Sequence, residues 1–305
     1  MKNFLRKFTF LIALKETLVG VYYTIRSWWP LWFYMLNRDA RMRYKNHPPN
    51  LNEVQQKIVR ELKENGIATA DIHELFPDRK NLLEELQLYA VKLRQSAGIS
   101  QKKKFLLELW EPVPLLDFQN PFIGLSCEER ILEIAAGYFE MYPKVYYSML
   151  NVTLPVGEGE TPVQSQRWHR DPEDKKICKM FIYLTDVDKD SGPFTYVTKS
   201  HHGGIWRRLF PQHPPHGSYP PLGVVEKIIP PHVVKECLAK AGTVIFCDTS
   251  GLHKGGYART RERIMFTAGY IPPSSRWKTQ YRYPDNFREI LSRASPLVLY
   301  ALTKK

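Results

Sequence analysis

The 305-residue sequence is poor in cysteine and contains no long uninterrupted apolar run. Its four cysteines are scattered without paired spacing, which argues against a disulfide framework or a zinc ribbon and favours a reducing compartment. The apolar stretches near the N-terminus are interrupted by Lys15, Glu16 and Arg26. Because a membrane-spanning helix needs about 20 consecutive apolar residues, these stretches are too short to span. No small-residue cleavage site follows the first of them, so a secretory signal peptide is also a poor fit.

The sequence also lacks internal repeats and any helix-turn-helix or base-stacking signature. Hydrophobic residues make up 43% and charged residues 25%, a composition that is ordinary for globular proteins and excludes disordered, collagen-like and coiled-coil classes. The length suits one large or two modest domains. The net charge of +13 indicates an anionic partner, such as nucleic acid, an acidic membrane surface or an anionic small molecule.

More than half of this charge lies in the first 50 residues, where nine Lys and Arg face two acids and contribute +7 of the +13. The same stretch is rich in leucine and aromatic residues. Basic, aromatic-rich amphipathic segments favour the membrane interface. We therefore predict that residues 1–46 form one or two helices on a membrane surface, and we expect a cytoplasmic protein at the inner face of a membrane. The alternative is a hydrophobic helix that covers the core of the protein or a partner subunit.

Residues 47–50 have the composition of a linker, which leaves 47–305 as the main domain. Capping signals at Asn52 and Gly66 predict a helix between them, and apolar spacing predicts another over 80–95. Ser126 and Glu129 have the spacing of a capping box for a helix to about residue 140. Short β-rich runs follow, separated by turn residues, and they indicate a sandwich or barrel. These runs are 146–154, 179–184, 194–197, 243–247 and 264–270. A proline-rich insert at 206–223 interrupts them.

His169-Arg170-Asp171 is the single His-x-Asp sequence in the chain. In an extended segment residues i and i+2 point the same way, so this imidazole and this carboxylate can bind one metal. A facial triad for non-haem iron(II) needs a second histidine from elsewhere. His253 is the candidate, since it follows the strand predicted at 243–248 and precedes Gly255-Gly256. The alternative is a surface histidine beside a turn-forming aspartate. The other histidines compete less well: His47, His73, His201, His202, His213, His216 and His232.

Arg263 follows His253 by ten residues and begins a β-rich run. An enzyme that chelates a dicarboxylate keto acid on iron needs a cation for the far carboxylate, and arginine pairs with carboxylates through a planar fork. Arg259 and Arg261 are alternatives, and Arg261 shares the strand parity of Arg263.

Two stretches resemble the phytanoyl-CoA dioxygenase family. The first is Gln-Arg-Trp-His-Arg-Asp, which ends at Asp171, with the run from Phe181 to His201. The second is Ala-Gly-Thr-Val-Ile-Phe-Cys-Asp, followed by His253 and Arg263. The resemblance covers roughly residues 50–272. It implies a mainly β, α+β fold with a double-stranded β-helix (jelly-roll) core and N-terminal helices.

The family consists of Fe(II)/2-oxoglutarate-dependent dioxygenases, and the resemblance implies a role for six residues. His169, Asp171 and His253 would be iron ligands and Arg263 the 2-oxoglutarate anchor; Asn151 and Phe181 would lie beside 2-oxoglutarate, Phe181 by packing only. The sequence departs from the family at Ser191-Gly192 and Thr198-Lys199-Ser200-His201, where Asn-Gly and Pro-Gly-Ser-His are common. Neither departure touches the implied metal site, and the first 50 residues have no counterpart in the shared core.

The predicted function is Fe(II)/2-oxoglutarate-dependent hydroxylation of a C–H bond in a small or lipid-linked substrate, with O2 consumed and succinate and CO2 released. Arg207, Arg208, His213 and His216 of the insert could contact an anionic group, or be merely solvated. One alternative function is a non-catalytic jelly-roll binding module at a membrane surface. Another is a nucleic-acid demethylase, which is weaker because most of the charge lies in the apolar N-terminus. We expect no nucleic-acid partner.

Overall fold

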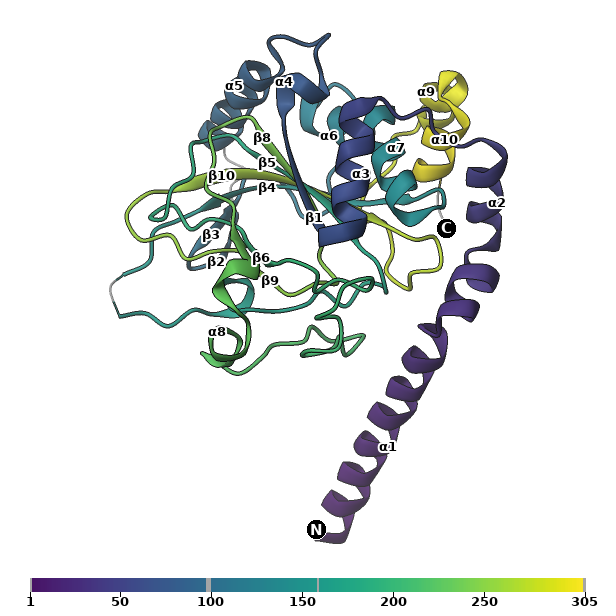
Figure 1. The fold of residues 1–305 in the computed structure, drawn as a ribbon, viewed down its shortest axis with the longest axis vertical. Helices are drawn as coiled ribbons and strands as arrows, with labels where there is room; N and C mark the ends of the chain where they lie inside the picture. Colours follow the sequence, from purple (N-terminus) through teal and green to yellow (C-terminus); the bar gives the residue numbers. More distant parts are fainter. Residues whose placement is uncertain (1, 97–99, 158, 304–305) are drawn as a thin grey trace.

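A computed structural model describes residues 2–96, 100–157 and 159–303, which form two antiparallel β-sheets flanked by helices (Figure 1). The larger sheet has the strand order β1-β8-β5-β10-β4-β3-β2 and the smaller one β7-β6-β9. The strands are β1 (Ile67–Asp71), β2 (Ser100–Lys103), β3 (Leu106–Glu108), β4 (Lys144–Thr153), β5 (Cys178–Tyr183), β6 (Thr195–Val197), β7 (Val234–Glu236), β8 (Thr243–Asp248), β9 (His253–Lys254) and β10 (Arg263–Ile271). All five β-rich runs predicted from the sequence are strands, displaced by at most two residues at either end.

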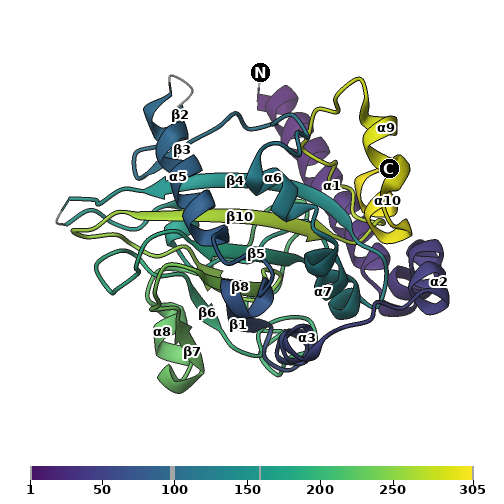
Figure 2. The same ribbon diagram turned by 90° about the horizontal axis from the view of Figure 1, so that it is seen from above.

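Helices cover one face of the larger sheet and extend from one of its ends (Figure 2). The α-helices are α1 (Lys2–Arg26), α2 (Arg38–Asn46), α3 (Glu53–Asn65), α4 (Ile72–Leu75), α5 (Leu82–Gln95), α6 (Pro121–Ser126), α7 (Glu129–Phe139), α8 (Val224–Ile228), α9 (Phe287–Ile290) and α10 (Pro296–Leu302). A π-helical turn, η1 (Leu31–Leu36), precedes α2, and short 3-10 turns are η2 (Gln164–Gln166), η3 (Pro231–Val233) and η4 (Leu291–Arg293).

Helix α3 has the ends that its sequence predicts. Asn52 accepts a hydrogen bond from the backbone of Gln55, and the Gln55 side chain accepts one in return from the backbone of Asn52. Gly66 ends the helix in the left-handed region, at φ 78°. A Cβ there would lie 2.4 Å from the Tyr196 hydroxyl, so glycine is required by both conformation and space.

The capping box predicted at Ser126 and Glu129 is wrong. Ser126 is the last residue of α6, and its hydroxyl donates to the carbonyl oxygens of Phe122 and Ile123 within that helix. The cap position of α7 is occupied by Glu128, which makes no side-chain cap. The spacing of a capping box is short and recurs by chance, and here burial of the apolar side chains of α7 determines where the helix begins.

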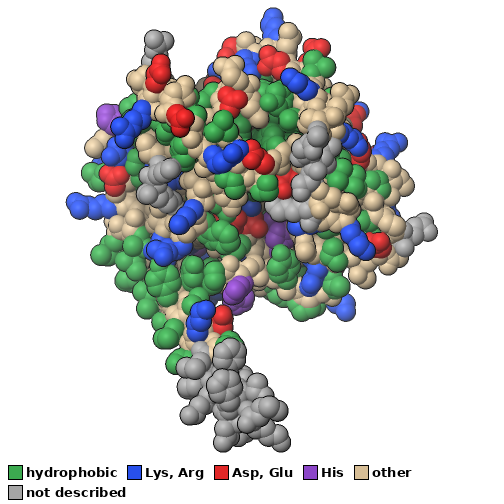
Figure 3. All heavy atoms as spheres, turned by 180° about the vertical axis from the view of Figure 1, so that it is seen from behind, with side chains coloured by type: hydrophobic (Ala, Val, Ile, Leu, Met, Phe, Trp, Pro, Cys, Tyr) green, Lys and Arg blue, Asp and Glu red, His purple; other side chains and the backbone are tan. Residues whose placement is uncertain are grey.

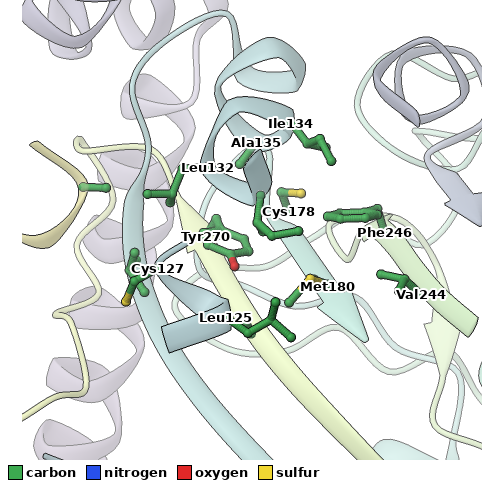
Figure 4. Packing of buried hydrophobic residues seen from close by; sticks show 14 of the residues in the cluster. Leu125, Cys127, Leu132, Ile134, Ala135, Cys178, Met180, Val244, Phe246 and Tyr270 are labelled. Atoms are coloured by element: carbon green, nitrogen blue, oxygen red, sulfur yellow. The ribbon is translucent and has the colours of Figure 1, made fainter. Parts of the chain in front are cut away.

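The two faces of the larger sheet bury two separate apolar clusters, because neighbouring residues of a strand point to opposite faces. On the helix-covered face, Cys178 and Met180 of β5 pack with Phe246 of β8 beneath α7 (Figure 4). On the other face, Phe181 packs against Phe194, next to β6 of the smaller sheet, with ring centroids 4.7 Å apart. This second face is therefore the interior between the two sheets. All four cysteines are buried and free.

Residues 27–46 dock on the domain, whereas α1 extends beyond it (Figure 1). Trp32 is buried and donates from its indole nitrogen to Asp174 at 2.6 Å, and Lys175 donates to the carbonyl of Ser27 at 2.7 Å. No described helix combines the length and the apolar character needed to cross a membrane. The second half of residues 1–46 thus packs on the protein, which agrees with the alternative interpretation of this segment as a covering helix.

Two leucines of α5, one buried and one exposed, test which face of this helix packs on the core. Leu86 is fully buried in the core, and Leu88 on the same helix is 64% exposed. Leu86→Ala should lower the free energy of unfolding by about 2–5 kcal/mol, because it leaves a cavity. Leu88→Ala should change it by less than about 0.5 kcal/mol. Urea unfolding followed by circular dichroism measures both, and equal losses would contradict the assigned face.

Candidate metal centre

A short antiparallel bridge holds His169 and His253 side by side. The amide of His169 donates to the carbonyl of His253 at 2.8 Å, and the amide of His253 donates back at 3.0 Å. Their imidazole rings lie 4.2 Å apart between centroids. His253 stands on β9 of the smaller sheet, and His169 lies on the extended segment that pairs with it.

Asp171 completes a cluster of three metal-ligating groups. Its carboxylate oxygens lie 3.7 Å from Nε2 of His169 and 3.5 Å from Nε2 of His253. One ligand atom from each residue lies within 4.8 Å of the other two. All three side chains are at least mostly buried. The structure thus brings together the three residues that the sequence singled out.

Hydrogen bonds orient both imidazoles for coordination. Nδ1 of His169 lies 2.8 Å from the carbonyl oxygen of Arg167, and Nδ1 of His253 lies 3.0 Å from that of Gly251. A carbonyl only accepts, so each Nδ1 carries the proton and each Nε2 presents its lone pair toward Asp171. Two neutral imidazoles and one carboxylate form the ligand set of a non-haem iron(II) facial triad.

Lys179 and Glu173 adjoin this cluster, and the sequence pattern did not single out either of them. Lys179 of β5 donates to Oδ2 of Asp171 at 2.6 Å, and its ammonium lies 3.7 Å from Glu173. Strand parity could have found Lys179, since it precedes Phe181 by two residues and therefore faces the same interior. No comparable signal marks Glu173, whose position depends on the fold of the loop after Asp171.

Burial and charge set the protonation states here. Burial lowers the pKa of both imidazoles, that of His253 to about 3, which keeps them neutral and able to bind metal. Burial would raise the pKa of Asp171, but the Lys179 ammonium and the imidazoles outweigh it and hold that pKa well below its usual range. The pKa of Glu173 rises to about 7 through burial, partly offset by Lys179.

Arg170 lies between the candidate ligands His169 and Asp171, but its side chain points away from them and holds the backbone of the insert. Its buried guanidinium donates five hydrogen bonds, all to backbone carbonyl oxygens. The acceptors are Phe210, Ser200, Ser250, Trp206 and Leu209. Because an arginine side chain has five N–H donors, every one is satisfied. Arg170 thus connects the segment that carries His169 and Asp171 to the start of the insert.

Arg263 is buried in the interior between the sheets, whereas its rival Arg261 is exposed and pairs with Asp188 at 2.7 Å. The Arg263 guanidinium donates to the carbonyls of Gly192 and Gly255, the latter at 2.8 Å and two residues past His253. Its Nε–H has no partner among the described atoms. A buried, unpaired donor of this kind fits an anionic oxygen.

Asn151 and Phe181 line the same interior. Thr153 pairs with Arg263 across β4 and β10, and Asn151 lies two residues along on the same face. The Asn151 side-chain oxygen is buried and has no hydrogen-bond partner among the described residues. Phe181 presents an aromatic ring to this interior. The unpaired polar atoms of Asn151 and Arg263 mark a space suited to a polar ligand.

No protein-family model and no curated protein matches this sequence. Solved structures match the fold. The epimerase SnoN in complex with Fe3+, alpha ketoglutarate and nogalamycin RO superposes with a TM-score of 0.53 at 14% identity, covering 72% of this chain and 83% of that one. EctD from S. alaskensis with bound Fe gives 0.52 at 16% identity, covering 79% and 84%.

This chain has the double-stranded β-helix fold of these proteins. The comparisons confirm the fold that the family resemblance implied. At such identities they concern the fold, and the chemistry of the site follows from the residues described above.

We predict that His169→Ala weakens divalent metal binding by more than about 100-fold. Changing a residue that merely orients a metal ligand costs about 10–100-fold in affinity, and losing a ligand should cost more. Isothermal titration with Co(II) measures the affinity, with His232→Ala, an exposed histidine of η3, as the control. Equal affinities in all three proteins would show that the metal binds elsewhere.

Proposed function

We propose that the protein is an Fe(II)/2-oxoglutarate-dependent oxygenase that hydroxylates a lipid-linked substrate at a membrane surface. The observation that carries the enzymatic part is the convergence of two Nε2 lone pairs and one carboxylate in a buried site. Residues 47–305 would form the catalytic domain, with 206–223 as its insert and 1–46 as a membrane-facing extension.

His169, Asp171 and His253 would hold the iron, leaving positions open for 2-oxoglutarate and O2. When bound, the iron with its co-substrates 2-oxoglutarate and O2 would supply the oxidising chemistry that inserts oxygen into a C–H bond and releases succinate and CO2. Lys179 orients the Asp171 carboxylate by holding one of its oxygens. The ligands lie in a buried site between the two sheets, which limits the access of water.

Arg263 would bind the far carboxylate of 2-oxoglutarate, because it offers a buried cation with an unpaired N–H on the interior face. Asn151 would contribute a polar side chain beside it, and Phe181 an apolar wall. The contact of Arg263 with Gly255 ties this anchor to the segment that carries His253.

The test of the enzymatic proposal is an anaerobic titration of the iron-loaded protein with 2-oxoglutarate, followed by its visible charge-transfer band. The parent should form the band. Arg263→Lys should need at least about tenfold more 2-oxoglutarate, since lysine lacks the planar fork. Arg261→Lys, at an exposed position, should match the parent. No band in folded, metal-loaded parent protein would overturn the proposal and favour a non-catalytic jelly-roll binding module.

The membrane contact is supported by uncovered apolar side chains on α1. Leu14, Leu18, Val21 and Ile25 recur at three- and four-residue spacing and are exposed. Apolar side chains also gather where the N-terminal helix leaves the body of the molecule, with Lys and Arg among them (Figure 3). This combination suits a helix lying in the headgroup region of an anionic membrane.

Vesicle flotation tests the membrane contact. Val21→Glu with Ile25→Glu should lower binding to vesicles that contain phosphatidylglycerol at least about tenfold, because it places two anions on the apolar stripe. Leu88→Glu with Val91→Glu introduces the same charges at equally exposed positions of α5. This control should bind as the parent does. Loss of binding in both variants would point to net charge, and loss in neither would exclude the α1 stripe.

A further inference from the structure

A basic pocket of about 310 Å³ lies beside the candidate metal centre, where several separate parts of the chain meet. The end of α1, the segment after Asp171, the insert and the loop after β10 all contribute to its walls. Five cationic side chains line it: Arg26, Lys175, Arg207, Arg208 and Arg276. Within the described ranges, none of the five forms an ion pair with a carboxylate.

Two carboxylates also line the pocket, and each has a partner other than the five cations. Asp174 accepts the indole N–H of Trp32, and Glu173 lies 3.7 Å from the ammonium of Lys179. Burial and the neighbouring lysines lower the pKa of His202, another lining residue, to about 3. The pocket therefore has an excess of positive charge that suits an anion.

The pocket continues into an apolar groove along α1. A second cavity of about 320 Å³ shares Tyr23, Ser27 and Pro214 with it, and a third of about 560 Å³ shares Tyr23 and Arg276. The walls of the third are mainly apolar side chains of α1: Leu14, Leu18, Val19, Tyr22 and Tyr23. The tip of the insert closes the other side through Pro215, and His216 lies 3.6 Å from Glu16 of α1.

We propose that this groove binds a phosphate-bearing lipid, with its phosphate among the five cations and its chain against α1. Arginine pairs well with phosphate oxygens, and an apolar wall that adjoins a cationic pocket matches an anionic amphiphile rather than a free anion. The proposal rests on the membrane contact proposed above and adds the chemical class of the lipid. Arg170 and Pro172, the neighbours of Asp171, line the pocket, so the bound phosphate would lie close to the candidate metal centre.

Isothermal titration with dihexanoyl phosphatidic acid, which is monomeric in solution, tests the groove without a membrane and without iron. The parent should bind one molecule, at least tenfold more tightly than it binds either dihexanoyl phosphatidylcholine or inorganic phosphate. Equal binding of the phosphatidylcholine would overturn the role of the cations. Equal binding of inorganic phosphate would overturn the role of the apolar wall and leave a site for free phosphate.

Arg208→Gln with Arg276→Gln should weaken the binding of dihexanoyl phosphatidic acid at least tenfold. The two residues are far apart in sequence, and both line the pocket. Arg60→Gln with Lys80→Gln removes equal charge at exposed positions outside it and should bind as the parent does. Equal affinity in both double variants would overturn the site. The charge-transfer titration of Arg208→Gln with Arg276→Gln separates the proposals, because its band should persist even where lipid binding is lost.

Discussion

The backbone bridge between His169 and His253 is the constraint on which the candidate site depends. Two hydrogen bonds join segments that are far apart in the chain, and they place both imidazoles on one side of the pair. Each ring is then turned by a carbonyl two residues before it, Arg167 for one and Gly251 for the other. Neither orientation needs a side-chain partner, so the geometry of the candidate metal site is a consequence of the β-structure itself.

Side chains alternate in direction along an extended segment, so the stretch from His169 to Asp171 has two roles. His169 and Asp171 face the candidate metal centre, and Arg170 faces the opposite way. There its guanidinium holds five carbonyls of the insert and neighbouring loops, although burial lowers its pKa to about 10. Leaving a buried charge unpaired is costly, so this arginine strongly favours one placement of the insert. The position of the pocket wall therefore follows from the same segment as the metal ligands.

The sequence predicted what local pattern and strand parity determine. The five β-runs, both ends of α3 and the pairing of His169 with Asp171 all follow from spacing. Tertiary contact decided the rest. Arg263 and Arg261 have the same parity, and only their burial separates them. Lys179 was missed because a lysine in a strand suggests a solvated position, whereas its ammonium is stabilised by Asp171. The capping box at Ser126 failed because α6 extends to that residue.

The segment after Asp171 connects the candidate site to the N-terminal extension residue by residue. Glu173 lies next to Lys179, which contacts Asp171. Asp174 accepts a hydrogen bond from the indole of Trp32, and Lys175 donates one to the carbonyl of Ser27. A displacement of residues 27–46 would therefore act on the backbone next to Asp171, a candidate metal ligand. Since α1 leads directly into these residues, a movement of that helix would also reach the wall between the basic pocket and the candidate metal ligands. If α1 lies on a membrane, as proposed, these contacts would link that surface to the candidate site.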